Sequence, residues 1–327
     1  MGRKLRSKAM WGLVLALAIL MVAQASWAQL TKVRAGYMPI SCYTQLYWAL
    51  EKGNFQAEGL TVEAITVPSS GRSLEAVSGG SMEVGTATPL ELALARDKGF
   101  DYVIVAPGCT SGTVRTPGIG PGYKDQSPLM VLEDSPIKTA KDLEGKPVGT
   151  HALYSINWLF TMDWVKKKGA DPNKLNWLEV PFPQLDVALR TRRVVAVHIT
   201  EPFATVSLRQ GGVRALDYPF TAHTSDLALG HPVTTEAWAK KNVDLVRKFA
   251  RAVNKAIVDM EGKPAERLEA LRKYVKIDPE LARAMVWPNW GTSIDFKSIQ
   301  AYLDLALEWK LINKRQRSTD LVYELGR

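Results

Sequence analysis

Four short segments of the chain combine hydroxyl, aromatic or charged side chains with the expected beginning of a helix. They span residues 37–44, 68–73, 85–89 and 151–158. Each follows an apolar run typical of a strand, and a helix that starts after such a strand directs its first backbone N–H groups toward a ligand. Hydroxyl groups there also cap helices, so capping alone is an alternative at each position. Four such segments together favour one shared binding site.

The candidate ligand contacts are the polar, aromatic and glycine residues of these segments. Arg72 adds charge-assisted hydrogen bonds if the ligand is an anion, with a solvated position on its helix as the alternative. Trp158 lies beside Tyr154 and is the tryptophan that we expect to contact the ligand, whereas most others fill the core. The full set comprises Tyr37, Ser41, Tyr43, Ser70, Gly71, Arg72, Thr86, Thr88, His151, Tyr154, Ser155 and Trp158.

Motifs of the common enzyme classes are absent from the sequence. It contains no G-x-S-x-G elbow, no H-E-x-x-H, no C-x-x-C and no Walker lysine loop. His198 and Glu201 lie at an apolar strand, where a buried histidine with satisfied hydrogen bonds is favoured over a metal ligand. We therefore expect no catalytic residue, no metal and no cofactor.

The chain has two cysteines, Cys42 and Cys109. Both follow expected strands of the N-terminal half, so their loops can meet over a cleft. An oxidising compartment would favour a disulfide between them, but the sequence leaves open whether they are bonded.

The first 28 residues are typical of an export signal. Basic residues at 3–8 precede an apolar run over 9–23, and Ser26-Trp27-Ala28 places small residues at both positions of a cleavage site. The run is too short to cross about 30 Å of hydrocarbon comfortably, although an uncleaved anchor is the alternative. We expect cleavage before Gln29 and a periplasmic protein without a lipid anchor.

Composition is that of an ordinary globular protein. The 327 residues are 46% hydrophobic and 23% charged, and this length predicts two domains. Lys and Arg number 42 against 33 Asp and Glu, but four of the basic residues lie among the first eight. The remaining mild excess is a poor argument for a nucleic-acid partner, which selects a basic stripe on one face.

From Lys32 onward, short apolar runs alternate with amphipathic segments, which predicts two α/β lobes with parallel sheets followed by terminal helices after about Thr221. Expected strands cover Val33–Tyr37, Leu60–Val67, Met82–Thr86, Tyr102–Val105, Ser127–Leu132, Pro147–Thr150, Trp177–Val180 and Val194–Ile199. Expected helices cover Tyr43–Lys52, Ser73–Ser78, Leu90–Lys98, Ser155–Lys168 and Gln184–Arg190, with helical spacing again over 246–260 and 299–309.

Several motifs occur in one order along residues 32–260. They are R-A-G-Y-x-P at 34–39, L-Y-W-A-L-E-K-G-N-F at 46–55, L-E-A-V-S-G-G at 74–80, I-K-T-A-K-D-L-E-G-K-P-V-G at 137–149, G-A-D-P at 169–172 and E-P-F at 201–203. In these motifs the chain resembles the nitrate-, sulfonate- and taurine-type solute-binding proteins of ABC importers. It departs from them at Arg192 and Val195, and its 107–127 loop is long for the group.

The resemblance implies a type II periplasmic-binding-protein fold, in which two α/β lobes joined by two crossing segments close on a ligand. Residues 29–127 with 222–327 would form lobe one, and residues 128–221 lobe two. The resemblance adds Glu201 to the candidate ligand contacts and places the others at the same cleft.

The function implied is that of a monomeric periplasmic receptor, not an enzyme. It would capture a small anion (a sulfonate, taurine, nitrate or an aromatic carboxylate) and deliver it to an ABC permease in the inner membrane. Two alternatives are a lyase or dehydratase on the same fold and a ligand-sensing periplasmic domain. The resemblance says little about the ligand.

Overall fold

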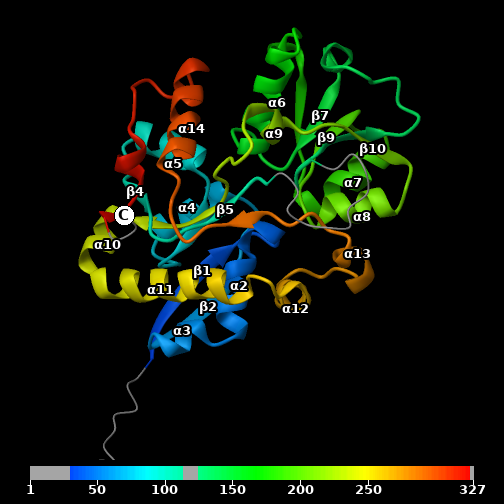
Figure 1. The fold of residues 1–327 in the computed structure, drawn as a ribbon. Coiled ribbons are helices and arrows are strands. Elements are labelled where there is room, and N and C mark those ends of the chain that lie inside the picture. Colours follow the sequence, from blue (N-terminus) through cyan, green and yellow to red (C-terminus); the bar gives the residue numbers. More distant parts are fainter. Residues whose placement is uncertain (1–29, 113–123, 325–327) are drawn as a thin grey trace, which may run out of the picture.

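The computed structural model describes residues 30–112 and 124–324 and shows two lobes of mixed helix and sheet (Figure 1). One lobe combines the blue-to-cyan and yellow-to-red parts of the chain, and the green middle part builds the other. The predicted export signal at 1–28 and residues 113–123 of the Gly- and Pro-rich loop lie outside the described residues.

A parallel pair of strands begins lobe one. Strand β1 (Thr31–Tyr37) pairs with β2 (Leu60–Thr66) over seven residues, with Ala35 opposite Ala64. Alternating apolar residues in both strands favour this pairing, since one face of the sheet is covered by helices. Ala35 also bridges Val84, so β1 continues toward the next sheet of the lobe.

The second sheet of lobe one is antiparallel, which differs from the predicted parallel arrangement. Strand β11 (His231–Thr235) lies between β3 (Gly85–Ala87) and β4 (Tyr102–Ile104) and is antiparallel to both. The chain returns from lobe two through β11 and enters the sheet in the opposite direction. The prediction that residues after about 221 are mostly helical overlooked this strand.

Helices cover lobe one on both sides of its strands. The early ones are α2 (Thr44–Glu51), α3 (Asn54–Ala57), α4 (Ser70–Ser78) and α5 (Pro89–Asp97), with the 3-10 turn η1 (Ser41–Tyr43) before α2. The late ones are α10 (Glu236–Lys241), α11 (Val243–Met260), α12 (Pro264–Tyr274), α14 (Phe296–Glu308) and the 3-10 turn η4 (Ser318–Leu321).

Helix α11 shows why these residues form a packed helix. Val246, Phe249, Val253, Ile257 and Met260 recur at helical spacing and are all buried. This apolar face packs against α2 and α3, so its stability comes mainly from burial of that face.

Lobe two contains a five-stranded sheet in the order β10-β6-β9-β7-β8. Strands β7, β8 and β9 are parallel, whereas β6 is antiparallel to both of its neighbours. The strands are β6 (Leu129–Leu132), β7 (Pro147–Thr150), β8 (Asn176–Glu179), β9 (Ala196–His198) and β10 (Val213–Asp217). The helices are α6 (Ile156–Lys167), α7 (Phe182–Arg190), α8 (Phe203–Arg209) and α9 (Pro219–His223), with the 3-10 turns η2 (Ala140–Leu143) and η3 (Pro172–Lys174).

The two chain segments that join the lobes are fastened to each other. Asp125, on the segment that enters lobe two, accepts hydrogen bonds from the backbone N–H (3.2 Å) and the hydroxyl (2.6 Å) of Thr221 on the returning segment. Burial raises the pKa of Asp125 to about 6, against the effect of these hydrogen bonds. These two hydrogen bonds therefore link the two crossing segments where they pass between the lobes.

A third segment, residues 284–290, runs along both lobes and is here named the strap. It leads from α13 (Pro279–Arg283), which packs on α8 of lobe two, to β12 (Asn289–Trp290), which pairs with β5 (Cys109–Thr110) of lobe one (Figure 1). Among the described residues, no helix combines the length and the apolar character that a membrane span requires.

Candidate ligand-binding site

A small cavity of about 30 Å³ lies between the two lobes. Its lining, mostly apolar with a few polar groups, is that of a small-molecule site, and its volume is far below the about 300–1,000 Å³ typical of such sites, so a solute enters only when the lobes move apart. Lobe one contributes Met38, Ile40, Cys42, Tyr43, Ser70, Thr88, Glu91, Leu229 and Gly230, and the segments of lobe two contribute Gln126, His151, Ile156, Asn157, Phe182, Thr200 and Phe220.

Tyr43 and Gly230 shape the lobe-one wall together. A Cβ at Gly230 would lie 2.3 Å from the Tyr43 hydroxyl oxygen, so only glycine leaves room for this ring. Burial raises the pKa of Tyr43 well above its usual range, so the phenol stays neutral. The wall thus presents a neutral aromatic ring.

Glu91 is a buried carboxyl on the lobe-one wall. It is the third residue of α5 and forms a capping box with Thr88, whose backbone N–H it accepts at 3.0 Å and whose hydroxyl also contacts it. Burial raises the pKa of Glu91 to about 7, partly offset by hydrogen bonds from Thr88 and Ser70. Near neutral pH the Glu91 side chain therefore exists both as a protonated acid, which can donate and accept hydrogen bonds, and as a carboxylate, which can only accept them.

The opposite wall offers polar atoms that have no partner among the described residues. The side-chain amide nitrogen and oxygen of Gln126 and the Nδ1 of His151 are all buried and unpaired. Burial lowers the pKa of His151 to about 3, with a smaller contribution from His198, so its ring is neutral at pH 7. Since unpaired buried polar groups cost free energy, a ligand that pairs with them is stabilised here.

Aromatic rings complete the lobe-two wall. The ring of Phe182 is stacked on His151 with centroids 4.1 Å apart and planes 15° apart. Phe220 lies edge-on to Phe160, which is fully buried behind it. These flat, rigid faces favour a planar ligand.

The residues lining the cavity include one ionisable acid, Glu91, and no lysine or arginine. Its donors are therefore neutral groups and the backbone N–H groups at the start of α4, where Ser70 lines the cavity. This charge pattern suits a ligand that donates hydrogen bonds or carries positive charge more readily than it suits an anion.

Four of the residues singled out from the sequence line this cavity. Tyr43, Ser70 and Thr88 do so from lobe one, and His151 does so from lobe two. The structure therefore brings all four predicted segments, three from lobe one and one from lobe two, together at one site between the lobes.

Two further candidates lie beside the cavity, whereas a third, Arg72, faces solvent. Gly71 and Tyr154 line an adjoining interlobe groove that shares Ser70 and Glu91 with it. Arg72 lines neither space: its guanidinium pairs with Glu75 at 2.7 Å and its side chain is 69% exposed. The reason is local, because Ser69 caps α4 and Arg72 then falls on the outer face of the first turn.

Three candidates have structural contacts within lobe one or at the start of α6. Tyr37 packs edge-on against Tyr47 and Tyr274, with centroids 5.1 and 5.7 Å apart. Ser155 caps α6 by accepting from the N–H of Trp158, whose ring belongs to the hydrophobic core. None of the three candidates (Tyr37, Ser155 and Trp158) lines the cavity.

The remaining three candidates are buried outside the cavity lining. The backbone N–H of Thr86 donates to Ser73 at 2.8 Å, and that of Ser41 donates to the carbonyl of Glu201 at 3.1 Å. The Glu201 carboxyl accepts from Thr205 and from the N–H of Val286 in the strap. Their positions indicate roles in holding the walls of the site.

Cys42 and Cys109 form a disulfide, so the question that the sequence left open is answered. The bond joins η1 to β5, and its Cα atoms are 5.4 Å apart. His198 is buried with both ring nitrogens hydrogen-bonded, as predicted: Nδ1 lies 2.8 Å from Thr161 and Nε2 lies 3.0 Å from the carbonyl of Ser127. Within residues 30–112 and 124–324, no cluster of three side chains is arranged to hold a metal ion.

Several cavity residues escaped the sequence analysis. Glu91 belongs to a T-P-x-E capping box, and its position at the first turn after a strand was a usable signal. Gln126 follows the irregular Gly- and Pro-rich loop, and Phe182 and Phe220 begin short helices. Nothing in the local sequence around Gln126, Phe182 and Phe220 distinguishes a residue that lines the cavity from one that lies in the hydrophobic core.

The chain is similar to one protein family and to several binding proteins. The NMT1-like family matches residues 26–277. The formylaminopyrimidine-binding protein of Halalkalibacterium halodurans is 23% identical over 246 residues, which are 73% of this chain and 69% of the relative. The riboflavin-binding protein RibY of Chloroflexus aurantiacus is 24% identical over 269 residues, 77% of this chain and 68% of the relative.

A solved structure shows the same fold. The alkanesulfonate-binding protein SsuA from Xanthomonas axonopodis pv. citri, bound to MOPS, superposes with a TM-score of 0.73 at 18% identity, covering 90% of this chain and 98% of that one. The predicted periplasmic-binding-protein fold is thereby confirmed.

Proposed function

Because this chain belongs to the NMT1-like family and its relatives include solute-binding proteins, we propose that it is the periplasmic receptor of an ABC importer and that its solute binds between the lobes. Closure of the lobes around the solute would favour the bound state in proportion to its higher affinity for the closed form. The receptor acts as a monomer and passes the solute chemically unchanged to a permease in the inner membrane.

The unpaired polar atoms of Gln126 and His151, facing the buried Glu91 across the cavity, carry the proposal about the ligand. Gln126 offers a donor and an acceptor, and a neutral imidazole offers one of each. Glu91 accepts hydrogen bonds when ionised. A planar nitrogen heterocycle with amino or ring N–H donors matches this set and stacks against Phe182.

The names of two relatives support a heterocycle. One is described as binding a formylaminopyrimidine and the other riboflavin, and both compounds are planar nitrogen heterocycles. Neither name assigns a ligand to this chain, which is 23–24% identical to these relatives.

A small anion, the class expected from the sequence, is the second candidate. The start of α4 at Ser70 lines the cavity, and a helix N-terminus favours negative charge. The structurally similar SsuA is an alkanesulfonate-binding protein. The buried Glu91 argues against a small anion, because its ionised carboxylate would repel one.

A thermal-shift screen with two solute panels tests the proposal. The first panel holds aminopyrimidines and flavins, and the second holds alkanesulfonates, taurine, nitrate and benzoate. We expect stabilisation by at least one heterocycle, by an amount that grows with solute concentration. Stabilisation by the anions alone would select the second candidate, and no stabilisation by either panel would contradict both.

The fate of the solute separates transport from catalysis. After incubation with the protein, a bound heterocycle should be recovered unchanged by mass spectrometry. Recovery of a converted product would favour the enzyme alternative.

A further inference from the structure

A second hollow of about 380 Å³, open to solvent, lies where α12 begins and faces the strap. It shares no lining residue with the interlobe cavity. Its walls include Met260 from the end of α11, Arg267 from α12, and Trp287, Pro288 and Trp290 from the strap. Arg267 is the one cationic side chain that lines this hollow, whose other lining residues are mostly apolar or aromatic and include the exposed Glu261.

Arg267 has no acidic partner among residues 30–112 and 124–324. No carboxylate lies within 4.0 Å of its guanidinium in the described part of the chain, and its Nε is buried without a hydrogen-bond acceptor. The undescribed segments 1–29, 113–123 and 325–327 contain no Asp or Glu side chain, so they supply none either. A partly buried cation without a counter-ion is uncommon, because burial of an unpaired charge costs free energy.

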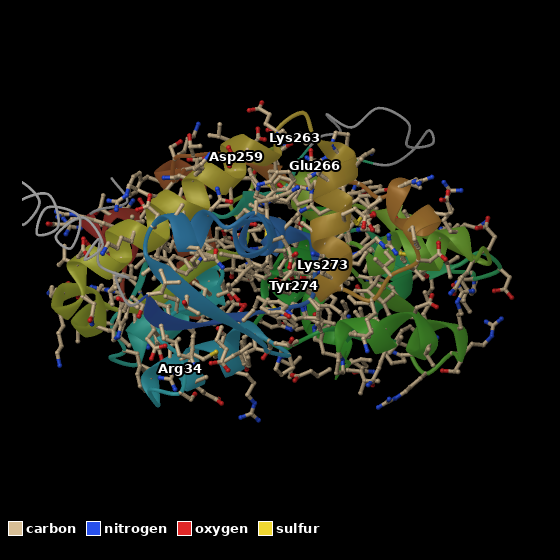
Figure 2. The ribbon with its side chains drawn as sticks, turned by 90° about the horizontal axis from the view of Figure 1, so that it is seen from below. Arg34, Asp259, Lys263, Glu266, Lys273 and Tyr274 are labelled. Atoms are coloured by element: carbon tan, nitrogen blue, oxygen red, sulfur yellow. A yellow bond between two sulfur atoms is a disulfide. The ribbon has the colours of Figure 1, made fainter. Side chains whose placement is uncertain are left out.

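Carboxylates close to Arg267 along the chain are engaged elsewhere. Glu266 pairs with Lys52, and Glu269 pairs with Arg272. Figure 2 shows Lys263 and Glu266 at the first turn of α12, with Asp259 on the neighbouring α11. Asp259 pairs in turn with Lys255. Glu261 is an exposed residue that lines the hollow, and among the described residues it forms neither an ion pair nor a hydrogen bond with Arg267.

Two tryptophans hold the guanidinium in place. Its central carbon lies 4.4 Å from the ring centroid of Trp287 and 5.5 Å from that of Trp290. The indole N–H of Trp290 is fixed by the carbonyl of Cys42 (3.1 Å) and the side chain of Gln45 (3.0 Å). Stacking on ring faces occupies the flat surface of the guanidinium but leaves the N–H edge free for an acceptor.

Arg267 keeps its charge under ordinary conditions. Burial lowers its pKa to about 10, so the guanidinium is protonated near pH 7. The group therefore combines a fixed orientation, a full positive charge and an Nε donor without an acceptor among the described residues.

We propose that Arg267, Trp287 and Trp290 form a second binding site, which takes a small organic anion. The carboxylate or phosphate group of such a ligand would accept paired hydrogen bonds from the guanidinium edge, a geometry that arginine favours. The body of the ligand would lie against Trp287, Pro288 and Met260, which is why an organic anion suits the hollow better than an inorganic one. This site is independent of the proposed solute and of the interlobe cavity.

The test follows the indole N–H signals of Trp287 and Trp290 by NMR, assigned with Trp287→Phe and Trp290→Phe. The purified protein is titrated with benzoate, phenyl phosphate and inorganic phosphate up to about 10 mM, which detects millimolar affinity. We expect saturable shifts of the Trp287 signal with the two organic anions and weaker shifts with inorganic phosphate. Arg267→Gln should lower their affinity roughly 10- to 100-fold.

Two further variants complete the design. Arg251→Gln removes a surface arginine that pairs with Glu58 and should leave the affinity unchanged. Arg267→Lys keeps the charge but loses the planar fork, so it should weaken binding less than Arg267→Gln, and it decides the question if the glutamine variant fails to fold. The proposal is overturned if no probe shifts the Trp287 signal, or if the affinity is the same with and without Arg267.

Discussion

The carboxyl group of Glu201 accepts a hydrogen bond of 3.1 Å from the backbone N–H of Val286 and so joins lobe two to the strap. The same carboxyl accepts from the N–H (3.0 Å) and the hydroxyl (2.7 Å) of Thr205. Burial raises its pKa to about 7 in spite of these donors. The Glu201 carboxyl thus connects lobe two to the strap, and its charge changes near neutral pH.

Stability should fall with rising pH because of Glu201. A carboxyl whose pKa is raised on folding contributes stability that is fully present below its unfolded pKa of about 4.5, and that contribution is lost as pH rises through about 7. For a shift of this size the loss is roughly 3 kcal/mol. Chemical denaturation at several pH values between 5 and 8 measures it.

Glu201→Gln should remove the part of this pH dependence that Glu201 contributes, whatever its effect on stability at one pH, while Glu91 and Asp125, whose pKa values burial also raises, keep their contributions. Glu133→Gln, at an exposed position, serves as the matched control and should keep the wild-type slope. Parallel curves for Glu201→Gln and wild type would show that Glu201 does not titrate in this range.

The pH dependence of solute binding should reveal the role of Glu91. Ionisation of this group, whose pKa burial raises to about 7, creates an acceptor for a heterocycle with N–H donors. Affinity for a heterocycle that does not itself titrate should therefore rise between pH 6 and 8, and affinity for a sulfonate should fall. Calorimetric titration between pH 6 and 8 distinguishes the two kinds of ligand. Glu91→Gln should remove the pH dependence of the affinity.

Phe182 should contribute to affinity through its flat face. Phe182→Ala removes an aromatic wall of the cavity and should weaken solute binding by about 1–3 kcal/mol, or roughly 5- to 150-fold. Val187→Ala on the same helix α7 changes a side chain that is exposed and should have no effect. Equal affinities of the two variants would exclude Phe182 from the site.

The disulfide should stabilise lobe one. It closes a loop between residues 67 positions apart, and a loop of this size is typically worth about 2–4 kcal/mol. Replacement of both cysteines by serine should lower the free energy of unfolding by that amount, as should a reducing agent. An unchanged denaturation midpoint would count against the bond.

Much of the fold is predictable from local pattern. Helix α11 keeps its buried residues at helical spacing, and β2 follows a clear run of alternating residues, so both are close to the expected ranges. Strand β11 is not predictable in this way. His231 and Pro232 are poor signals for a strand, and its place between β3 and β4 depends on a pairing with residues more than 120 positions earlier.

The site is predictable only in part, for a related reason. Tyr43, Ser70, Thr88 and His151 lie at the ends of strands, where topology directs residues to one cleft. Arg72 differs from them because one residue of helical rotation decides between cavity and solvent. Gln126 and Phe220 reach the cavity through segments that cross between the lobes, and their path is set by tertiary packing rather than by local sequence.

A crystal structure of the protein with the solute that stabilises it most tests the central claim directly. The account predicts that the solute lies between the lobes, with its ring against Phe182 and its polar groups within hydrogen-bond distance of Gln126, His151 and Glu91. A solute bound on the surface of one lobe, with the space between these residues unfilled, would contradict it.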